Sequence, residues 1–407
     1  MRVVMVGPFG LHARGTMSVR ALPMAKVLVD RGHTVTMLLP PWHMPEEAGT
    51  HWIEGGVSVE NVELPPRIPA LFHLLTAARL TRRALALTPD VIHCFKPKAY
   101  SGLTHWLLTR SPRHPRVVVD TDDWEGPGGW NALGDYSPVL RRFFAWQERW
   151  GLTHANGVTV ASRTLESLTW SMGVPPARVF YVPNGVGYRP LDTQMEPSAP
   201  EVSPATAAPP VLLLYTRFFE FPPARPIEVV LEVRQRMPES RLLVVGQGFF
   251  GEEAAFLARA REAGLSVDDR SAASAEPKRE LASDVTYLGW VEPDDLPRYF
   301  DRADVALYPF ADTLVNRTKC AVKLVDLLAA GVPVVAEAVG QNRAYIRHGE
   351  TGWLVEPGEA TAFAEGVVHL LQDRSLRRRL GRAAARDVRQ RFTWRRLAET
   401  VEAAYRT

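Results

Sequence analysis

Residues 308–337 read YPFADTLVNRTKCAVKLVDLLAAGVPVVAE and contain the signals that decide the fold. The segment 319–330 has the apolar spacing of a helix, and Gly331 follows it as the expected C-terminal cap. Pro333 cannot continue a helix, so we expect the apolar residues 332–336 to form a buried strand. A loop, a helix and a buried strand in this order are typical of a parallel α/β sheet.

Positive charge gathers where this helix is expected to start. Arg317, Lys319 and Lys323 lie there, and Asp326 follows one turn later. Free backbone N–H groups and added cations suit a diphosphate, and a carboxylate further along suits sugar hydroxyls. Lysine is rare in this chain, which strengthens that interpretation, because an ammonium is a good point-charge ligand for phosphate. An ordinary amphipathic helix with solvated charges is the alternative.

The composition is that of a soluble globular protein, with 46% hydrophobic and 23% charged residues. Its 407 residues are enough for two or three domains, and a net charge of +3 does not indicate a nucleic-acid partner. Cys94 and Cys320 lack metal-ligand spacing, so we expect free thiols in a reducing compartment. No apolar run approaches the ~18 residues of a membrane span, and no secretory leader is evident. We therefore expect a cytoplasmic protein.

The first half of the chain opens with a strand at Arg2–Val6, a glycine-bearing loop, a helix over 17–31 and a second strand, HTVTMLLP. This order predicts a right-handed βαβ unit in a parallel sheet. The loop glycines Gly7, Gly10 and Gly15 do not match GxGxxG, which argues against a dinucleotide fingerprint. Glycines in such a loop serve either a ligand or a tight turn, and the sequence leaves both open.

Residues 67–88 predict a basic amphipathic helix, with Phe72 and Arg82 among its apolar and basic side chains. Such a helix either lies on an anionic membrane surface or packs one face on the core. Further on, FFAWQERWGL predicts a helix whose Trp146 and Trp150 pack in the core.

Acidic residues follow the apolar strand RVVV, in the run Asp120–Asp123. The carboxyl edge of a parallel sheet is where ligand crevices open. The DxD spacing superficially matches a metal motif, yet nothing nearby completes a set of oxygen ligands. We therefore expect no metal here, and either a direct contact of Asp122 with substrate or simple loop capping.

The Pro-, Ala- and Ser-rich run at 191–210 predicts a linker. The alternation of strands and helices restarts after it, which predicts two doubly wound Rossmann-like lobes that face a cleft. The boundaries are 1–190 for the first domain, 211–391 for the second, and 392–407 for a terminal helix that returns to the first.

Several motifs occur in an order typical of one enzyme family. They are YVPNGVG at 181–187, RLLVVGQG at 241–248, VTYLGWV at 285–291, DLLAAGVPVVA at 326–336 and GETGWLVEPGE at 349–359. Over nearly its whole length the chain resembles the GT-B glycosyltransferases of family 4. The resemblance implies a retaining, metal-independent hexosyltransferase without cofactor. Its substrates would be a nucleotide-diphosphate sugar of UDP or GDP type and a hydroxyl acceptor, which the basic helix suggests is lipid- or glycan-linked.

The resemblance also assigns donor-binding residues in the second lobe. Asp326 takes the place of a glutamate that holds ribose hydroxyls, and Thr318 replaces the glutamate that contacts the transferred sugar. Arg217 matches the family's diphosphate-binding arginine, but Pro222 stands where a lysine usually follows it. We expect Lys319, Lys323 or Arg225 to replace that charge. Lys319 and Ala321 stand where glycines normally approach the diphosphate, and Gly246 lies on the donor side.

In the first lobe, the resemblance places the loop Gly10–Gly15 under the donor phosphates. Asp122 stands where many members have a histidine beside the reacting sugar, so we expect it, Lys319 and Lys323 to be catalytic. A carboxylate there could accept the proton of the acceptor hydroxyl or stabilise oxocarbenium charge. The departures from the pattern leave two alternatives open: another GT-B enzyme, such as an epimerase or a phosphorylase, or a non-catalytic sugar-nucleotide-binding subunit.

Overall fold

The computed structural model describes residues 1–13, 15–68, 71–113, 115–186, 209–272 and 281–407. The chain forms two compact units. The N-terminal unit comprises Met1–Arg189, Arg317–Cys320 and Phe392–Thr407, and the C-terminal unit comprises Pro190–Asn316 and Ala321–Arg391. The predicted linker lies almost entirely outside the described residues.

The N-terminal unit is built on a sheet in the order β3-β4-β2-β1-β5-β6-β7-β8, parallel except where β3 joins it. Its strands are β1 (Arg2–Val6), β2 (Thr34–Leu39), β3 (His51–Glu54), β4 (Val57–Asn61), β5 (Val91–Phe95), β6 (Val117–Thr121), β7 (Gly157–Val160) and β8 (Val179–Tyr181). The central strands β5 and β6 are buried along their whole length, which explains why they read as continuous apolar runs.

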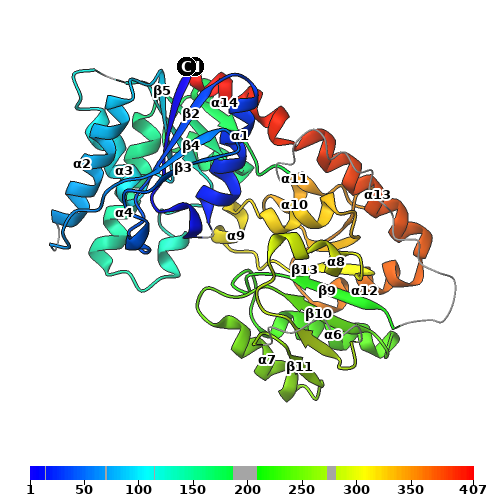
Figure 1. The fold of residues 1–407 in the computed structure, drawn as a ribbon. Helices are drawn as coiled ribbons and strands as arrows, with labels where there is room; N and C mark the ends of the chain where they lie inside the picture. Colours follow the sequence, from blue (N-terminus) through cyan, green and yellow to red (C-terminus); the bar gives the residue numbers. More distant parts are fainter. Residues whose placement is uncertain (14, 69–70, 114, 187–208, 273–280) are drawn as a thin grey trace. The chain divides into compact units, whose positions relative to one another are not determined.

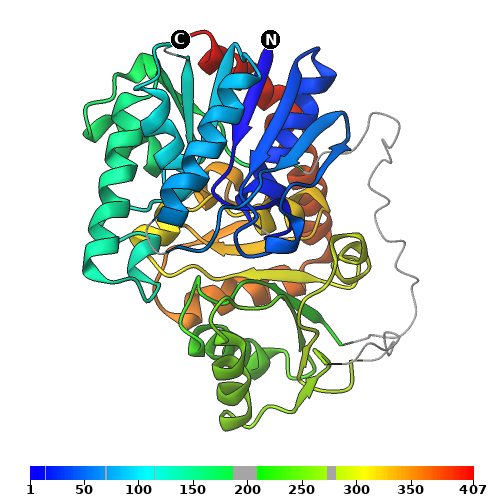
Figure 2. The same ribbon diagram turned by 60° about the vertical axis from the view of Figure 1, so that its left-hand side comes forward.

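Helices cover both faces of this sheet (Figures 1 and 2). They are α1 (Leu22–Asp30), α2 (Leu71–Ala86), α3 (Ala99–Leu108), α4 (Pro138–His154), α5 (Arg163–Ser171) and the terminal α14 (Trp394–Tyr405). Short helical turns are η1 (Leu11–Ala13), η2 (Met17–Ala21), η3 (Pro45–Glu47), η4 (Trp130–Ala132) and η5 (Pro176–Arg178), of which η2 is a π-helical turn that runs into α1. Ser137 and Ser162 cap the first turns of α4 and α5 with their hydroxyls.

The terminal helix α14 belongs to the N-terminal unit, as expected from the sequence. It packs beside α1, and the two ends of the chain lie close together (Figure 2). Trp394, Val401 and Tyr405 are buried in the same apolar core as β1 and α1. Thr393 caps the helix through the backbone N–H of Arg396.

The C-terminal unit contains a parallel sheet in the order β11-β12-β10-β9-β13-β14-β15. Its strands are β9 (Val211–Tyr215), β10 (Arg241–Val245), β11 (Val267–Asp269), β12 (Val285–Tyr287), β13 (Val305–Tyr308), β14 (Val334–Glu337) and β15 (Trp353–Val355). Its helices are α6 (Ala224–Arg236), α7 (Glu252–Glu262), η6 (Pro293–Asp295), α8 (Pro297–Phe300), α9 (Leu314–Thr318), α10 (Val322–Ala329), α11 (Asn342–Tyr345), α12 (Ala360–Gln372) and α13 (Arg374–Arg391), with the last residues of α9 falling in the N-terminal unit. Two Rossmann-like α/β units confirm the predicted fold class.

In the stretch 308–337, the end of the helix lies where the sequence predicted it, but the start does not. Gly331 has φ of +77°, and its N–H donates to Leu328 while the N–H of Val332 donates to Leu327. This is a Schellman motif, which explains the glycine. The predicted helix start at Lys319 was wrong, because α10 begins at Val322 after an extended Ala321.

Two further strand pairings were not predicted. Strands β3 and β4 form an antiparallel hairpin whose turn residues, Gly55 and Gly56, have φ of 57° and 81°. Two consecutive glycines are a turn signal that the sequence offered. Strand β11 is short and lies at the sheet edge, where the pattern is weak. None of the described helices is long and apolar enough to cross a membrane.

An ion pair anchors α14 and should make stability depend on pH. Arg31 donates to both oxygens of Glu402 at 2.7 and 2.9 Å, and His33 lies 3.0 Å away. The hydrogen bonds from Arg31 lower the pKa of Glu402 to about 2, although burial opposes the shift. A depressed carboxylate pKa stabilises the fold above the unfolded value and stops doing so as the pH falls through the folded value.

We expect Glu402→Gln to lower the free energy of unfolding by about 2 kcal/mol at pH 7. The difference from wild type should shrink as the pH falls from about 4.5 toward 2. Urea unfolding at several pH values measures it, and Glu239→Gln, at an exposed position of the other unit, is the control. A difference that stays constant with pH would contradict this assignment.

Candidate active site

Polar side chains gather in the N-terminal unit at the carboxyl ends of β1, β5 and β6. The strand order reverses between β1 and β5, which is where open α/β sheets bind ligands. Lys96 follows β5, and Asp122 and Asp123 follow β6. The predicted candidate Asp122 therefore lies at the switch point of this sheet.

Lys96 is at the centre of this group. Its Nζ atom lies 3.2 Å from Asp122, 2.7 Å from Asp123 and 3.5 Å from Glu125. Its backbone has φ of 52°, an uncommon conformation for a residue with a side chain. A positive φ at such a residue persists only where the surrounding structure imposes it.

The carboxylates respond unequally to this environment. Burial raises the pKa of Asp122, and Lys96 offsets the effect only in part. Burial alone would also raise the pKa of Asp123, but Lys96 holds it below its usual value. The pKa of Lys96 is well above its usual value, because three carboxylates outweigh its burial. Asp122 is thus the more basic of the two aspartates, and it also accepts a hydrogen bond of 2.5 Å from Thr16.

The segment Arg317–Cys320 belongs to the same unit. The side-chain amide of Asn184 donates to the Cys320 carbonyl at 2.5 Å, and the Asn184 backbone N–H donates to the Cys320 sulfur at 3.1 Å. The Cys320 carbonyl thus accepts its hydrogen bond from Asn184, and the next residue, Ala321, is extended before α10 begins. Lys319 lies close enough to Asp123 to lower its pKa. The structure therefore brings the predicted residues Asp122 and Lys319 into one neighbourhood.

The glycine loop after β1 has a structural role at its first glycine. A Cβ on Gly7 would lie 2.7 Å from a Leu39 methyl and 2.8 Å from the Met17 sulfur, so a larger residue there would require these two buried side chains to shift. Gly10 is buried against Pro41. The Gly15 carbonyl accepts hydrogen bonds from the backbone N–H groups of Ser18 and Val19 at the start of η2.

In the C-terminal unit, a second group forms at the carboxyl end of β9. Lys323, in the first turn of α10, places its Nζ atom 3.5 Å from the centre of the Tyr215 ring. Burial raises the pKa of Asp326 to about 6, and Lys323 reduces this shift. Burial, followed by the charge of Asp326, raises the pKa of Tyr215. These three side chains form a compact site on β9 and α10.

Arg217 follows β9 and is held by aromatic rings. Its guanidinium carbon lies 4.3 Å from the centre of the Phe249 ring and 5.0 Å from that of Trp290. It also donates to the carbonyl of Gln247 at 3.1 Å. Gly246 lies nearby with φ of 127°, and a Cβ there would collide with the Thr216 carbonyl. Gly246 is therefore required by the close approach of two backbone segments.

Three of the predicted residues are buried or paired within the fold. Thr318 is completely buried, and Ala321 is the buried residue that caps α10. Arg225 donates to Glu337 at 2.5 Å and to the Glu359 carbonyl at 3.2 Å. Its charge is therefore balanced within the fold, and Arg225 is a poor replacement for the lysine that Pro222 displaces.

Sequence reasoning assigned no role to Lys96, Thr16 or Tyr215. Lys96 immediately follows an apolar strand in a chain with few lysines, and this position could have indicated a functional side chain. Thr16 and Tyr215 carry no such signal, because their roles depend on partners distant in the sequence. Within the described residues, no cluster of three or more His, Cys, Asp or Glu side chains is arranged to bind a metal ion.

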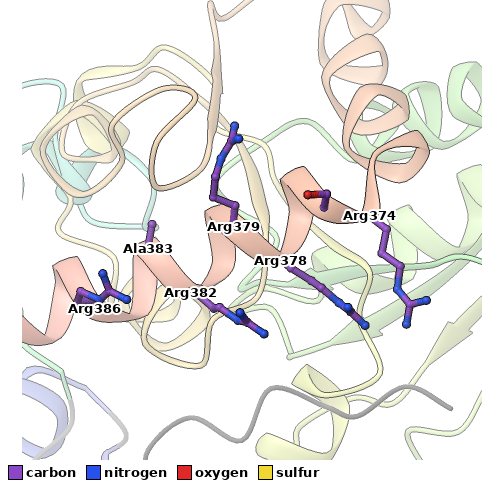
Figure 3. Close-up of a pocket in the computed structure, with 7 residues that line it drawn as sticks. Arg374, Arg378, Arg379, Arg382, Ala383 and Arg386 are labelled. Carbon is purple, nitrogen blue, oxygen red and sulfur yellow. The ribbon is translucent and has the colours of Figure 1, made fainter.

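Basic residues also line a depression of about 650 Å³ along α13 (Figure 3). Its lining contains Arg374, Ser375, Arg378, Arg379, Arg382, Ala383 and Arg386. All these residues come from one helix, and the lining described for the depression contains no aromatic or acidic side chain that would order a ligand. The depression is the solvated face of an amphipathic helix.

Removing the central lysine should destabilise the N-terminal unit in a pH-dependent way. In Lys96→Met, the largely buried Asp122 and Asp123 would lose their nearest counter-charge, whereas Glu125 would keep Lys98 at 2.9 Å. We expect a cost of about 3–5 kcal/mol near pH 8. Protonation of the carboxylates should reduce the loss near pH 5, because their folded-state pKa values would be raised. Urea unfolding at the two pH values measures the effect. Lys26→Met, which removes only a pair with Glu54, should cost 1 kcal/mol or less at both.

Comparison with known proteins agrees with this architecture. Residues 15–185 match the family model described as a glycosyl transferase 4-like domain, and residues 226–373 match that of glycosyl transferases group 1. The phosphatidyl-myo-inositol mannosyltransferase of Mycobacterium leprae is 25% identical over 100% of this chain and 97% of its own length.

Solved structures share the fold. Sucrose-phosphate synthase from Thermosynechococcus elongatus superposes with a TM-score of 0.72 at 19% identity, covering 100% of this chain and 98% of that one. HepE from Anabaena, solved in complex with UDP, superposes with a TM-score of 0.67 at 17% identity, covering 99% and 98%. The chain belongs to the GT-B glycosyltransferases of family 4 type.

Proposed function

We propose that this glycosyltransferase moves a hexose-type sugar from a nucleotide-diphosphate donor to a hydroxyl acceptor, with retention of anomeric configuration and without a metal ion. The observation that carries the proposal is the group Tyr215, Lys323 and Asp326, with Arg217 on the same strand end. It combines cations suited to a diphosphate with a carboxylate suited to hydroxyls. A solved relative of the same fold, HepE, was crystallised with UDP, which supports a donor of UDP or GDP type.

The main requirement of the reaction is to stabilise the departing diphosphate. Breaking the bond between the anomeric carbon and the diphosphate oxygen places negative charge on the diphosphate. Arg217, Lys323 and Lys319 would stabilise that charge. Each such contact lowers the barrier by roughly 2–4 kcal/mol. In this way the side chains would provide the charge stabilisation that metal ions supply elsewhere.

The remaining predicted residues would contact other parts of the donor. Asp326 would accept hydrogen bonds from ribose hydroxyls, with Gly246, Thr318 and Ala321 shaping the backbone around the donor. In the N-terminal unit, Gly10 and Gly15 would border the phosphates.

Asp122 is the proposed proton acceptor. Its raised pKa makes it a stronger base than an exposed aspartate. As the acceptor oxygen bonds to the anomeric carbon and the diphosphate departs, the hydroxyl proton would move to Asp122. Because the proposal assigns no covalent nucleophile, retention would require the acceptor to approach from the side that the diphosphate leaves.

The acceptor is proposed to be lipid- or glycan-linked. Helix α2 exposes Leu71, Leu74 and Leu75, and Arg79 and Arg82 lie on the same helix. This pattern suits peripheral association with an anionic membrane. The similar mycobacterial protein is named for a phosphatidyl-myo-inositol substrate, which agrees with such an acceptor.

Removing both lysines tests the leaving-group role. Lys319→Ala with Lys323→Ala should lower kcat by about a thousandfold or more, because two contacts to the developing charge are lost. The fold should persist, as judged by circular dichroism and thermal unfolding. The matched control is Lys26→Ala with Arg261→Ala, which removes one charge from each compact unit. Near-normal turnover in the lysine variant would contradict the role.

A thermal-shift screen tests the donor class. UDP, GDP, ADP, TDP and CDP with their common sugars are compared in the presence of EDTA. A ligand at a hundred times its Kd stabilises the native state by about 2.7 kcal/mol, which raises Tm by several degrees. We expect a selective shift with the uridine or guanosine series. The absence of a shift with every nucleotide would favour a non-catalytic protein.

A further inference from the structure

Helix α4 carries a continuous ridge of aromatic rings on its outer face. Phe143 stacks on Trp146 with 5.8 Å between ring centres, Trp146 on Trp150 with 6.1 Å, and Trp150 on His154 with 4.5 Å. Val139 continues the ridge one turn earlier and is 77% exposed, while Phe143 and Trp146 are 36% and 43% exposed. The prediction that Trp146 packs in the core was therefore wrong. An exposed apolar ridge over four turns marks an interaction surface.

The buried face of α4 combines apolar residues, Phe144 and Leu152, with two polar ones. Gln147 and Glu148 point inward and are almost completely buried. The Gln147 side chain exchanges hydrogen bonds with the backbone of Ala99, and Glu148 accepts one from Thr121. Polar contacts therefore help to hold the inner side of the helix, together with the buried Phe144 and Leu152.

The ridge is also held rigidly. Trp150 is half-buried against the buried His105 ring, with centres 5.0 Å apart. Phe143 contacts Phe144, which in turn packs against Tyr136. Side chains that are already ordered lose little conformational entropy when they meet a partner.

The chemistry of the ridge identifies its partner. Arg141, Arg142 and Arg149 are exposed on α4, and the helix has no exposed carboxylate, since Glu148 is buried. Ring centres 5.8 and 6.1 Å apart are offset, so neighbouring rings cover one another's faces in part and leave less of each face for a sugar to stack on. Apolar rings flanked by arginines match the boundary between lipid headgroups and acyl chains, where aromatic rings insert and arginines reach phosphates.

We propose that the aromatic ridge of α4 is a docking site for an anionic phospholipid membrane. Helix α3 packs against both α2 and α4, so the ridge belongs to the same helical layer as the exposed leucines of α2 (Figure 1). The inference deepens the proposed function, because it says which surface meets the membrane that holds a lipid-linked acceptor. Membrane binding itself requires no transfer chemistry, so it can be measured independently.

The experiment is flotation of the full-length protein with vesicles of phosphatidylcholine containing about one third phosphatidylglycerol, beside vesicles of phosphatidylcholine alone. Wild type should float with the anionic vesicles. Phe143→Ser with Trp146→Ser should weaken binding by about tenfold to a hundredfold, because two large rings no longer leave water. Arg142→Gln with Arg149→Gln should weaken binding at low salt, and this difference should fade in 0.5 M NaCl as charges are screened.

The matched control is Ile53→Ser with Trp170→Ser. These side chains are 74% and 41% exposed in the same compact unit, on β3 and α5. The control should bind vesicles like wild type. All variants should keep the thermal unfolding and nucleotide-induced Tm shift of wild type, because the substituted side chains lie at the surface.

Several results of these experiments would contradict the proposed membrane site. Wild type that does not float, or a ridge variant that floats as well as wild type, overturns the membrane site. Equal loss in the control variant shows a nonspecific effect of exposed apolar area and also overturns it. If the ridge variant instead converts an oligomer to a monomer in sedimentation, the ridge is a contact between copies of the chain. A normal nucleotide shift without flotation would leave the proposed transferase standing and reject only the membrane site.

Discussion

The N-terminal unit depends on one buried ion pair, between Arg20 of η2 and Asp120 of β6. Both side chains are fully buried, and Arg20 donates to the two carboxylate oxygens at 2.7 Å each. Burial would lower the pKa of Arg20, but Asp120 raises it above its usual value. Because a buried charge without its partner costs several kcal/mol, η2 and β6 must stay together for this unit to remain folded.

Hydrogen bonds extend from this pair to distant parts of the chain. Thr159 donates to Asp120, and His93 lies 3.2 Å from Thr159 and 2.9 Å from the Tyr405 hydroxyl of α14. In the other direction, Arg20 donates to Asn184, whose amide donates to the Cys320 carbonyl. Burial lowers the pKa of His93 to about 4, so the imidazole is neutral within this network at physiological pH. The terminal helix and the segment that carries Lys319 are thus tied to the same polar core.

Local patterns in the sequence predicted most of the architecture. Continuous apolar runs identified the central strands, and Gly331 with Pro333 identified the end of α10 and the start of β14. The beginning of α10 was missed because the Cys320 carbonyl before it is bound by Asn184, which lies 136 residues earlier than Cys320 in the chain. Similarly, the aromatic pattern of α4 shows that the helix is amphipathic but not which face is buried. The buried face includes Gln147 and Glu148, whose hydrogen-bond partners are Ala99, the first residue of α3, and Thr121 of β6. Asp122 was found from its place after a strand, whereas the lysine that governs its charge required the fold.

Both cysteines of the chain are buried, and both belong to the N-terminal unit. Cys94 lies within β5, where burial raises the pKa of its thiol to about 12, and Cys320 is held by Asn184. An alkylating reagent can therefore reach a thiolate only when this unit opens. The rate of thiol modification is consequently a native reporter of local opening around the Arg20–Asp120 core, and it is silent about the C-terminal unit, which contains no cysteine.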